Sequence, residues 1–215
     1  MAKQPRAKGA NRANPRADRN IGATPGTRGG RYQQDRTSNV IELNFPQKPK
    51  KQRVDIVPRN LSQETLVASL ENPNKYVTFA VGPAGTGKTL LATLHAIKCF
   101  KAGLVEKIVI TRPNVAVDDK DIGYLPGDIL KKMTPWMMPV LDVFGEYFTQ
   151  PEIQAMLEEN IIEMVPIAFI RGRTFKNAYI LVDEAQGTTP NSLLSILTRI
   201  GEGSKMVVTG DVSQV

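Results

Sequence analysis

The sequence predicts an α/β fold of three layers, in which helices cover both faces of a mainly parallel β-sheet. Several segments are almost continuously apolar, which is typical of strands buried on both faces. Segments with a helical spacing of apolar residues separate these strands along the chain. With 215 residues, the chain is long enough for one hydrophobic core and hardly for two.

The expected elements begin at Val54, where the composition changes to that of a globular domain. Asn60 precedes the first helical pattern and is a residue type that caps helices. Gly103 closes the second helix, and Pro113 stops the second strand. The expected helices cover residues 61–70, 88–102 and 192–200, and the expected strands cover residues 76–81, 107–111, 161–165, 178–182 and 205–209.

Residues 114–150 are expected to be less regular than the rest of this domain. Pro126, Pro135 and Pro139 punctuate the segment, and a proline inside a helix removes a backbone hydrogen bond.

The same segment holds a group of large apolar side chains: Trp136, Met133, Met137 and Met138. Met and Trp residues at such spacing are more often part of a core. A surface that stacks nucleic-acid bases or holds a partner is the alternative.

The positive charge of the chain is confined to its first quarter. Residues 1–53 contain 13 Lys and Arg against 3 Asp and Glu, a balance of +10, which leaves −3 for residues 54–215 because the whole chain carries +7. Few of these first residues are apolar, so the segment cannot bury enough surface to offset its ordering entropy. We therefore expect a disordered basic tail over residues 1–53, preceding one domain over residues 54–215.

The tail admits two interpretations. It is an arm that neutralises phosphates on RNA or DNA, with an affinity that falls steeply as salt rises, or it is a solvated extension that keeps the protein soluble. Its lone aromatic residue, Tyr32, offers almost no platform for stacking bases.

The single cysteine, Cys99, cannot form an internal disulfide, so a reducing, cytoplasmic location is expected. His95 lies four residues before it, a spacing that permits two metal ligands on one helix face. Two further ligands are not evident, and a packed helix face is the expected arrangement. No segment has the length and apolar character of a membrane span or a signal peptide, so no membrane association is expected.

A phosphate-binding loop is expected between the first strand and the second helix. The segment Gly82-Pro83-Ala84-Gly85-Thr86-Gly87-Lys88-Thr89 matches the Walker A pattern and has the strand before it and the helix after it that this pattern requires. Its glycines let backbone N–H groups curl around phosphate oxygens, and the helix N-terminus adds a favourable dipole. Lys88 would reach the β- and γ-phosphates, and the Thr89 hydroxyl would coordinate Mg²⁺.

Two carboxylates follow the apolar strand over residues 178–182. Side chains at the carboxyl end of a strand lie at the edge of a parallel sheet where ligands of open α/β folds bind. Asp183 is placed there to hold Mg²⁺ through a water molecule, as in a Walker B segment, and Glu184 to orient or deprotonate the attacking water.

A polar segment, Thr209-Gly210-Asp211-Val212-Ser213-Gln214, follows the next strand and is expected at the same edge. Gln214 would there hydrogen-bond the γ-phosphate or the water in line with it, and so distinguish a triphosphate from a diphosphate.

In this order, the loop, Asp183-Glu184-Ala185-Gln186 and Gly210-Asp211-x-x-Gln214 resemble motifs I, II and III of superfamily 1 helicases. The closer resemblance is to the PhoH-like (phosphate-starvation-inducible) ATPase family, over about residues 56–215. Besides the loop, two further segments carry this resemblance. One contains Thr111-Arg112-Pro113 and Gly123-Tyr124-Leu125-Pro126-Gly127-Asp128. The other runs from Arg171-Gly172-Arg173-Thr174 through Asp183 to Thr198-Arg199-Ile200-Gly201 and Gly210-Asp211.

This resemblance implies a RecA-like P-loop NTPase that binds and hydrolyses ATP with Mg²⁺, with RNA as substrate or stimulator and with rings formed by some members. Gln63 resembles the adenine-reading Gln of such enzymes, and a surface Gln is the alternative. The functional alternative is a nucleotide-gated RNA-binding module with negligible turnover. A third interpretation is a structural RNA-binding protein that acts through the basic tail.

Two departures from the family pattern stand out. Gly187 occupies the place where the family usually has Asn, and the chain stops at Val215, whereas relatives continue through a further strand and helices that bear another Arg. An edge of the sheet and part of the γ-phosphate shell are therefore expected to be missing. The chain is then either a fragment of a longer product or a clipped domain that hydrolyses poorly.

The negative charge of a phosphoryl-transfer transition state requires a further cation in addition to Mg²⁺ and Lys88. Arg112 also resembles the helicase residue that contacts a nucleic-acid backbone. Arg171 and Arg173 would equally anchor a turn or contact nucleic acid. The candidates are Arg112, Arg171, Arg173 and Arg199.

Overall fold

The structure is a computed structural model that describes residues 53–113 and 126–214, without the side chains of residues 126–132. The interpretation of residues 1–53 as a disordered basic tail therefore falls outside the described residues, apart from Arg53. Part of the segment expected to be irregular, residues 114–125, also lies outside them.

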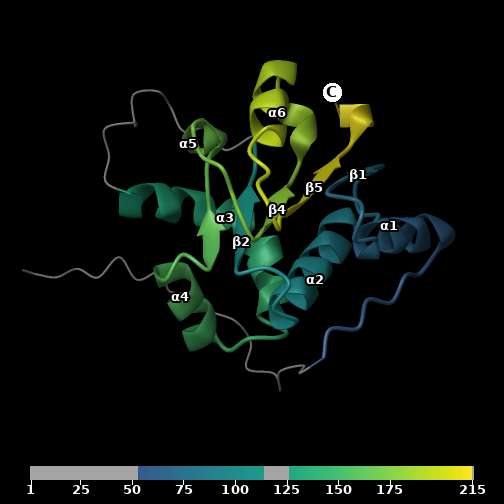
Figure 1. Cartoon of the computed structure of the whole chain (residues 1–215), viewed down its shortest axis with the longest axis horizontal. Coiled ribbons are helices and arrows are strands. Elements are labelled where there is room, and N and C mark those ends of the chain that lie inside the picture. Colours follow the sequence, from purple (N-terminus) through teal and green to yellow (C-terminus); the bar gives the residue numbers. More distant parts are fainter. Residues whose placement is uncertain (1–52, 114–125, 215) are drawn as a thin grey trace, which may run out of the picture. The chain divides into compact units, whose positions relative to one another are not determined.

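All five described strands are parallel and form one sheet in the order β1-β5-β4-β2-β3 (Figure 1). The sheet confirms the parallel α/β fold and each of the five expected strands. Within it, β4 is buried at every position, as an almost continuously apolar strand should be. The strands are β1 (Val77–Val81), β2 (Lys107–Thr111), β3 (Ile162–Met164), β4 (Ala178–Val182) and β5 (Lys205–Gly210).

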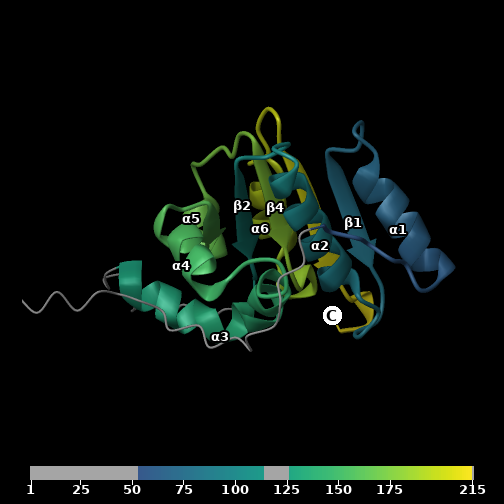
Figure 2. The same ribbon diagram turned by 90° about the horizontal axis from the view of Figure 1, so that it is seen from below.

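Helices cover both faces of this sheet, which completes a RecA-like arrangement (Figure 2). One face packs against α1 (Leu61–Glu71), α2 (Lys88–Lys101), α3 (Pro126–Phe144) and α4 (Gln150–Glu158). The other face packs against α5 (Ile167–Ile170) and α6 (Pro190–Leu197). Single 3₁₀ turns, η2 (Ala185–Gly187) and η3 (Val212–Gln214), follow β4 and β5.

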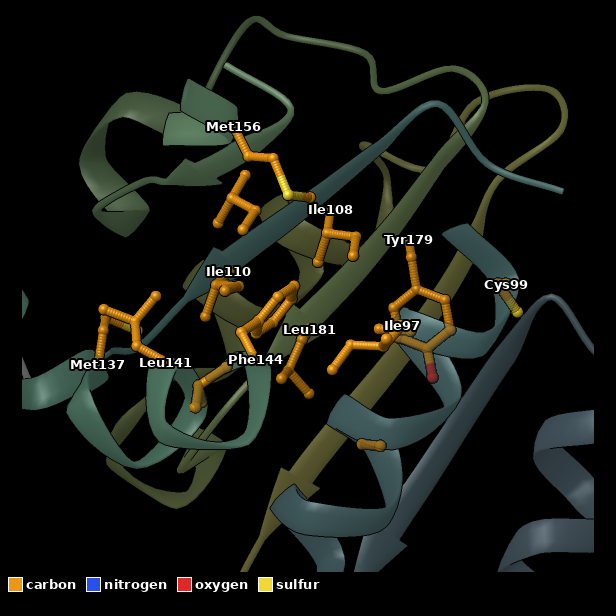
Figure 3. Packing of buried hydrophobic residues seen from close by; sticks show 14 of the residues in the cluster. Ile97, Cys99, Ile108, Ile110, Met137, Leu141, Phe144, Met156, Tyr179 and Leu181 are labelled. Atoms are coloured by element: carbon orange, nitrogen blue, oxygen red, sulfur yellow. The ribbon is translucent and has the colours of Figure 1, made fainter. Parts of the chain in front are cut away.

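The larger core cluster lies between the sheet and the helices of the first face. Figure 3 shows Ile97 of α2, Leu141 and Phe144 of α3, and Ile110 and Leu181 of the sheet pointing toward one another. Each of these side chains is at most 1% exposed. Burying apolar side chains of this size contributes about 1.5–3 kcal/mol each, so this packing fixes α2 and α3 on the sheet.

The expectation of a less regular segment is wrong for residues 126–144, because α3 contains Pro135 and Pro139 within 19 helical residues. Both prolines are exposed and four residues apart, so both lie on the outer face of the helix. The inner face is fully buried against the core, and this packing outweighs the two lost backbone hydrogen bonds. The buried residues on this face are Met133, Met137, Val140, Leu141 and Phe144.

Strand register places the functional segments at one edge of the sheet. Val81, the last residue of β1, lies beside Gly210 of β5, and Thr111 of β2 lies beside Val182 of β4. The residues that follow these strands therefore emerge at the same edge, as the sequence predicts.

Strand β1 lies at one border of the sheet, with Phe79 and Val81 about half exposed. The expectation that an edge of the sheet is missing stays a prediction. None of the helices in the two described ranges combines the length and the apolar character needed to cross a bilayer.

His95 is buried on α2, where its Nδ1 lies 3.2 Å from the Tyr179 hydroxyl and 3.7 Å from Cys99 Sγ. Burial lowers the pKa of His95 from 6.5 to about 4, and the charge of Lys205 acts in the same direction. The neutral imidazole is therefore the form that the folded core accepts.

We predict that the free energy of unfolding decreases as the pH falls from about 6.5 to about 4. Over this range the unfolded chain binds a proton at His95 that the folded chain does not, which removes about 3 kcal/mol. Urea denaturation at several pH values measures the effect. Because His95 is the only histidine, His95→Gln should flatten this part of the profile, and an unchanged slope in the variant would contradict the assignment.

Candidate functional site

The phosphate-binding loop joins β1 to α2, and its backbone conformation explains its glycines. Gly85 has φ 75° and Gly87, the residue that precedes α2, has φ 83°, values that side-chain-bearing residues rarely adopt. No atom lies within 4 Å of a Cβ built on Gly85, so conformation rather than space requires glycine there. The loop thus brings the N-terminus of α2, with its free N–H groups, to the edge of the sheet.

Lys88 lies across this loop. Its ammonium donates hydrogen bonds to the carbonyl oxygens of Gly82 at 2.6 Å and Pro83 at 2.7 Å. The positive charge is therefore held inside the curve of the loop, where a bound phosphate would meet it.

Asp183 is a buried acidic group of the site, with 4% of its surface exposed. Its Oδ1 accepts a hydrogen bond from the Thr89 hydroxyl at 2.6 Å and another from the Thr209 hydroxyl at 2.8 Å. The loop and the ends of β4 and β5 meet at this carboxylate. A hydroxyl and a carboxylate at the edge of the sheet are oxygen ligands of the kind that Mg²⁺ prefers, so the donor set fits this ion.

Glu184 has a left-handed backbone conformation, with φ 57°. This conformation costs a residue with a side chain about 1–2 kcal/mol and is commonly found at functional sites. Two contacts hold Glu184 there: its N–H donates to Thr209 Oγ1 at 3.4 Å, and its Oε2 accepts from Gln186 Nε2. The carboxylate thus lies beside the Gln186 side chain.

Gln186 and Asp211, two motif residues for which no role was expected, complete a polar network. Gln186 Nε2 contacts Gln214 Oε1 at 3.4 Å, and its Oε1 accepts from the Asp211 N–H at 3.1 Å. Asp211 Oδ2 accepts from the Ala84 N–H of the loop at 3.1 Å and from Gln214 Nε2 at 2.9 Å. Gln186 was visible as the last residue of Asp183-Glu184-Ala185-Gln186, but its partners depend on long-range packing.

The Ser213 hydroxyl, which donates to Asp211 Oδ1 at 2.6 Å, is the main cause of a lowered pKa at Asp211. The Ser213 and Ala84 N–H groups act in the same direction. Asp211 is therefore an ionised anchor for the loop.

Arg112, directly after β2, contacts both carboxylates of the site. Its Nη1 lies 3.7 Å from Asp183 Oδ2, and its Nη2 lies 3.8 Å from Glu184 Oε1. It also donates to the Trp136 carbonyl at 3.1 Å.

The other candidate arginines have different described contacts. Arg173 makes two hydrogen bonds to Glu163 of β3, at 2.5 and 2.9 Å, and packs over Phe175. Arg199 donates to the carbonyl oxygens of Ser195 at 3.0 Å and Arg173 at 3.3 Å. Arg173 and Arg199 thus anchor turns, whereas the exposed Arg171 has no contact to the carboxylates among those described.

Gln63, on α1, reaches the loop through a hydrogen bond from its Nε2 to the Thr86 carbonyl at 3.0 Å. Its Oε1 accepts from the Arg59 N–H at 2.7 Å. It lines a cavity of about 320 Å³ between α1 and β1 that also borders Lys88 and Thr78. Its role beside a nucleotide base stays a prediction.

The remaining expectations concern the residues around Trp136 and the pair His95 and Cys99. Met133 and Met137 are core residues, as expected, whereas Trp136 is 49% exposed and so does not belong to the core. His95 and Cys99 form a packed helix face. Within the described ranges no group of three His, Cys, Asp or Glu side chains is arranged to hold a metal ion.

Comparison with known proteins agrees with this geometry. The family described as PhoH-like protein matches residues 55–215, nearly the whole of the expected domain. The chain belongs to the PhoH family. Together with the loop between β1 and α2, this membership makes it a P-loop protein of the nucleotide-binding type.

Individual PhoH relatives come from distant bacteria. The chain is 41% identical over 157 residues to the PhoH-like protein of Bacillus subtilis, over 73% of this chain and 48% of the relative. It is 46% identical over 138 residues to that of Synechocystis, covering 64% and 42%, and 38% identical over 167 residues to Protein PhoH of Escherichia coli K12, covering 74% and 45%. The chain thus spans less than half the length of these relatives.

We predict that Thr209→Val lowers the free energy of unfolding by about 1–3 kcal/mol, because it removes a hydrogen bond from the buried Asp183 carboxylate. Thr78→Val is the matched control. Thr78 is also a buried strand threonine, but its hydroxyl has no hydrogen-bond partner among the described residues, so this change should leave stability unchanged or raise it. Equal urea midpoints for the two variants would show that the contact contributes nothing.

Proposed function

We propose that this chain binds ATP with Mg²⁺ and hydrolyses it. The observation that carries the proposal is the hydrogen bond between Thr89 of the loop and Asp183 at the end of β4, with Glu184 as the next residue. It joins a phosphate-binding element to a metal-binding carboxylate and a candidate base within one site.

Each part of the nucleotide has a group to meet it. The loop N–H groups and Lys88 would bind the β- and γ-phosphates, and Gln63 would contact the base from the cavity beside α1. Thr89 and Asp183 would hold Mg²⁺, which supplies positive charge to the phosphate oxygens when bound.

Glu184 is proposed to take a proton from the attacking water. It is about one-third exposed, and the hydrogen bond from Gln186 Nε2 orients its carboxylate. Gln186 connects it to Gln214, which is proposed to hydrogen-bond the γ-phosphate or the water in line with it. Loss of the γ-phosphate would then change the hydrogen bonds of both Gln214 and Gln186.

RNA is proposed as the stimulating partner on the basis of the tail. The balance of +10 over residues 1–53 favours a polyanion, and the domain itself offers no such excess. The proposed location is the cytoplasm, on the basis of one unpaired cysteine. Assembly into a homo-oligomeric ring is proposed only from the resemblance to the family.

A nucleotide-gated RNA-binding module with negligible turnover is the second candidate. The observation that favours it is Arg112, whose cation contacts both carboxylates on which hydrolysis depends. A comparison of binding with turnover separates the two candidates.

We predict that Glu184→Gln lowers the rate of ATP hydrolysis by about 10²- to 10⁴-fold while ATP binding persists, because the variant keeps the shape of the side chain and loses the base. Lys88→Ala should weaken binding as well. Phosphate release and calorimetric ATP titration measure the two quantities.

Glu159→Gln, an exposed position at the end of α4, is the matched control and should hydrolyse ATP as the wild type does. Equal rates in the wild type, Lys88→Ala and Glu184→Gln would remove the ATPase assignment. Binding of ATP with a wild-type rate no higher than that of Glu184→Gln would select the second candidate.

We also predict that poly(U) RNA raises the hydrolysis rate and that deletion of residues 1–53 weakens RNA binding at least tenfold. Because this binding rests on phosphate neutralisation, it should decrease steeply between about 50 and 200 mM salt. Fluorescence anisotropy of labelled poly(U) measures it. An unchanged RNA affinity after the deletion would exclude the tail as the binding element.

A further inference from the structure

Arg112 is the cation that the fold brings to both carboxylates. It follows Thr111, the last residue of β2, which pairs with Val182 directly before Asp183. The register of two neighbouring strands therefore fixes its place. Its side chain is only 21% exposed, so water screens these contacts less than those of a surface pair.

The contacts of this guanidinium are incomplete. Its distances to Asp183 and Glu184, 3.7 and 3.8 Å, exceed those of hydrogen bonds, and its one described hydrogen bond goes to the Trp136 carbonyl. Its Nε is buried without a hydrogen-bond partner among the described residues. An arginine fork that satisfied a carboxylate would make two short parallel bonds. Arg112 is thus held near the carboxylates by charge and is replaceable there.

Trp136 is the second contact of Arg112. The guanidinium carbon lies 5.9 Å from the centre of the indole ring, within the range of a cation–π interaction. On α3, Met133 and Met137 are buried, which leaves Trp136 half exposed beside Arg112. The indole therefore reports on the position of this arginine.

We propose that Arg112 is a positioning residue that competes with Mg²⁺ for Asp183, and that binding of Mg²⁺ with nucleotide moves it relative to Trp136. The proposal rests on the proposed function, since it takes Asp183 as the Mg²⁺ ligand. A divalent cation on Asp183 would repel a guanidinium that now lies 3.7 Å from the same carboxylate.

Removal of a competing arginine changes Mg²⁺ affinity in the opposite direction to removal of a structural or phosphate-binding arginine. Without a structural or phosphate-binding arginine, Mg²⁺ and nucleotide would bind more weakly. Without a competitor, Mg²⁺ binds at a lower concentration. Arg112 would then set the Mg²⁺ requirement of the site and offset part of the negative charge of its two carboxylates until nucleotide and metal arrive together.

The test titrates Mg²⁺ into the full chain at a saturating concentration of a non-hydrolysable ATP analogue and follows Trp136 emission and heat release. Trp136 is the only tryptophan, so the emission reports on this position alone. In the wild type we expect an emission change that saturates with Mg²⁺. In Arg112→Gln we expect the emission change to disappear and the calorimetric half-saturating Mg²⁺ concentration to fall about fivefold.

Two further variants separate charge from position. Lys98→Gln removes one positive charge from an exposed pair with Glu71, ten residues along α2 and about 15 Å from Lys88, and should titrate like the wild type. Arg112→Lys keeps the charge and should restore the Mg²⁺ requirement to within about twofold of the wild type.

The proposal would be overturned if the Arg112→Gln variant needs as much Mg²⁺ as the wild type, or more. It would also be overturned if Trp136 emission in the wild type stays constant while calorimetry records Mg²⁺ binding. An emission change that persists in the Arg112→Gln variant would overturn it as well. Failure of the wild type to bind the analogue at all would instead remove the proposed function, and the calorimetric titration of the analogue distinguishes that result.

Discussion

The hydrogen bond from Thr89 to Asp183 is the contact on which the rest of the site depends. It links the start of α2 to the end of β4, two elements that are separated along the chain and that meet only because β1, β5 and β4 lie side by side in one parallel sheet. A carboxylate with 4% exposure needs partners that offset the loss of water, and the two threonine hydroxyls supply them. The same need draws Arg112 toward the carboxylates from β2.

Around this contact, several features of the site lower the stability of the fold. Glu184 keeps a left-handed backbone, Arg112 keeps a buried Nε without a described partner, and Lys88 concentrates charge inside a glycine-rich loop. The two core clusters on the faces of the sheet support these costs, because their packing holds the strand ends in register. A polar network through Gln186 and Asp211 then ties the loop to the ends of β4 and β5.

Local patterns predicted the strands, α2 and the loop, since a short apolar run and a glycine-rich turn carry their own structural signal. They missed α3, because Pro135 and Pro139 argue locally against a helix that Leu141 and its neighbours stabilise through the core. They also favoured the core over a surface for Trp136 and left Arg112 unranked among four arginines. Both outcomes depend on packing between distant segments, which residue spacing alone does not contain.

The most direct measurement of the central claim is the affinity for Mn²⁺, a paramagnetic substitute for Mg²⁺, followed by electron paramagnetic resonance in the presence of ADP. If Thr89 and Asp183 form one metal site, Thr89→Val and Asp183→Asn should each weaken Mn²⁺ binding at least tenfold relative to the wild type. Equal Mn²⁺ affinity in the three proteins would show that the loop and β4 do not share a metal, and would contradict the account.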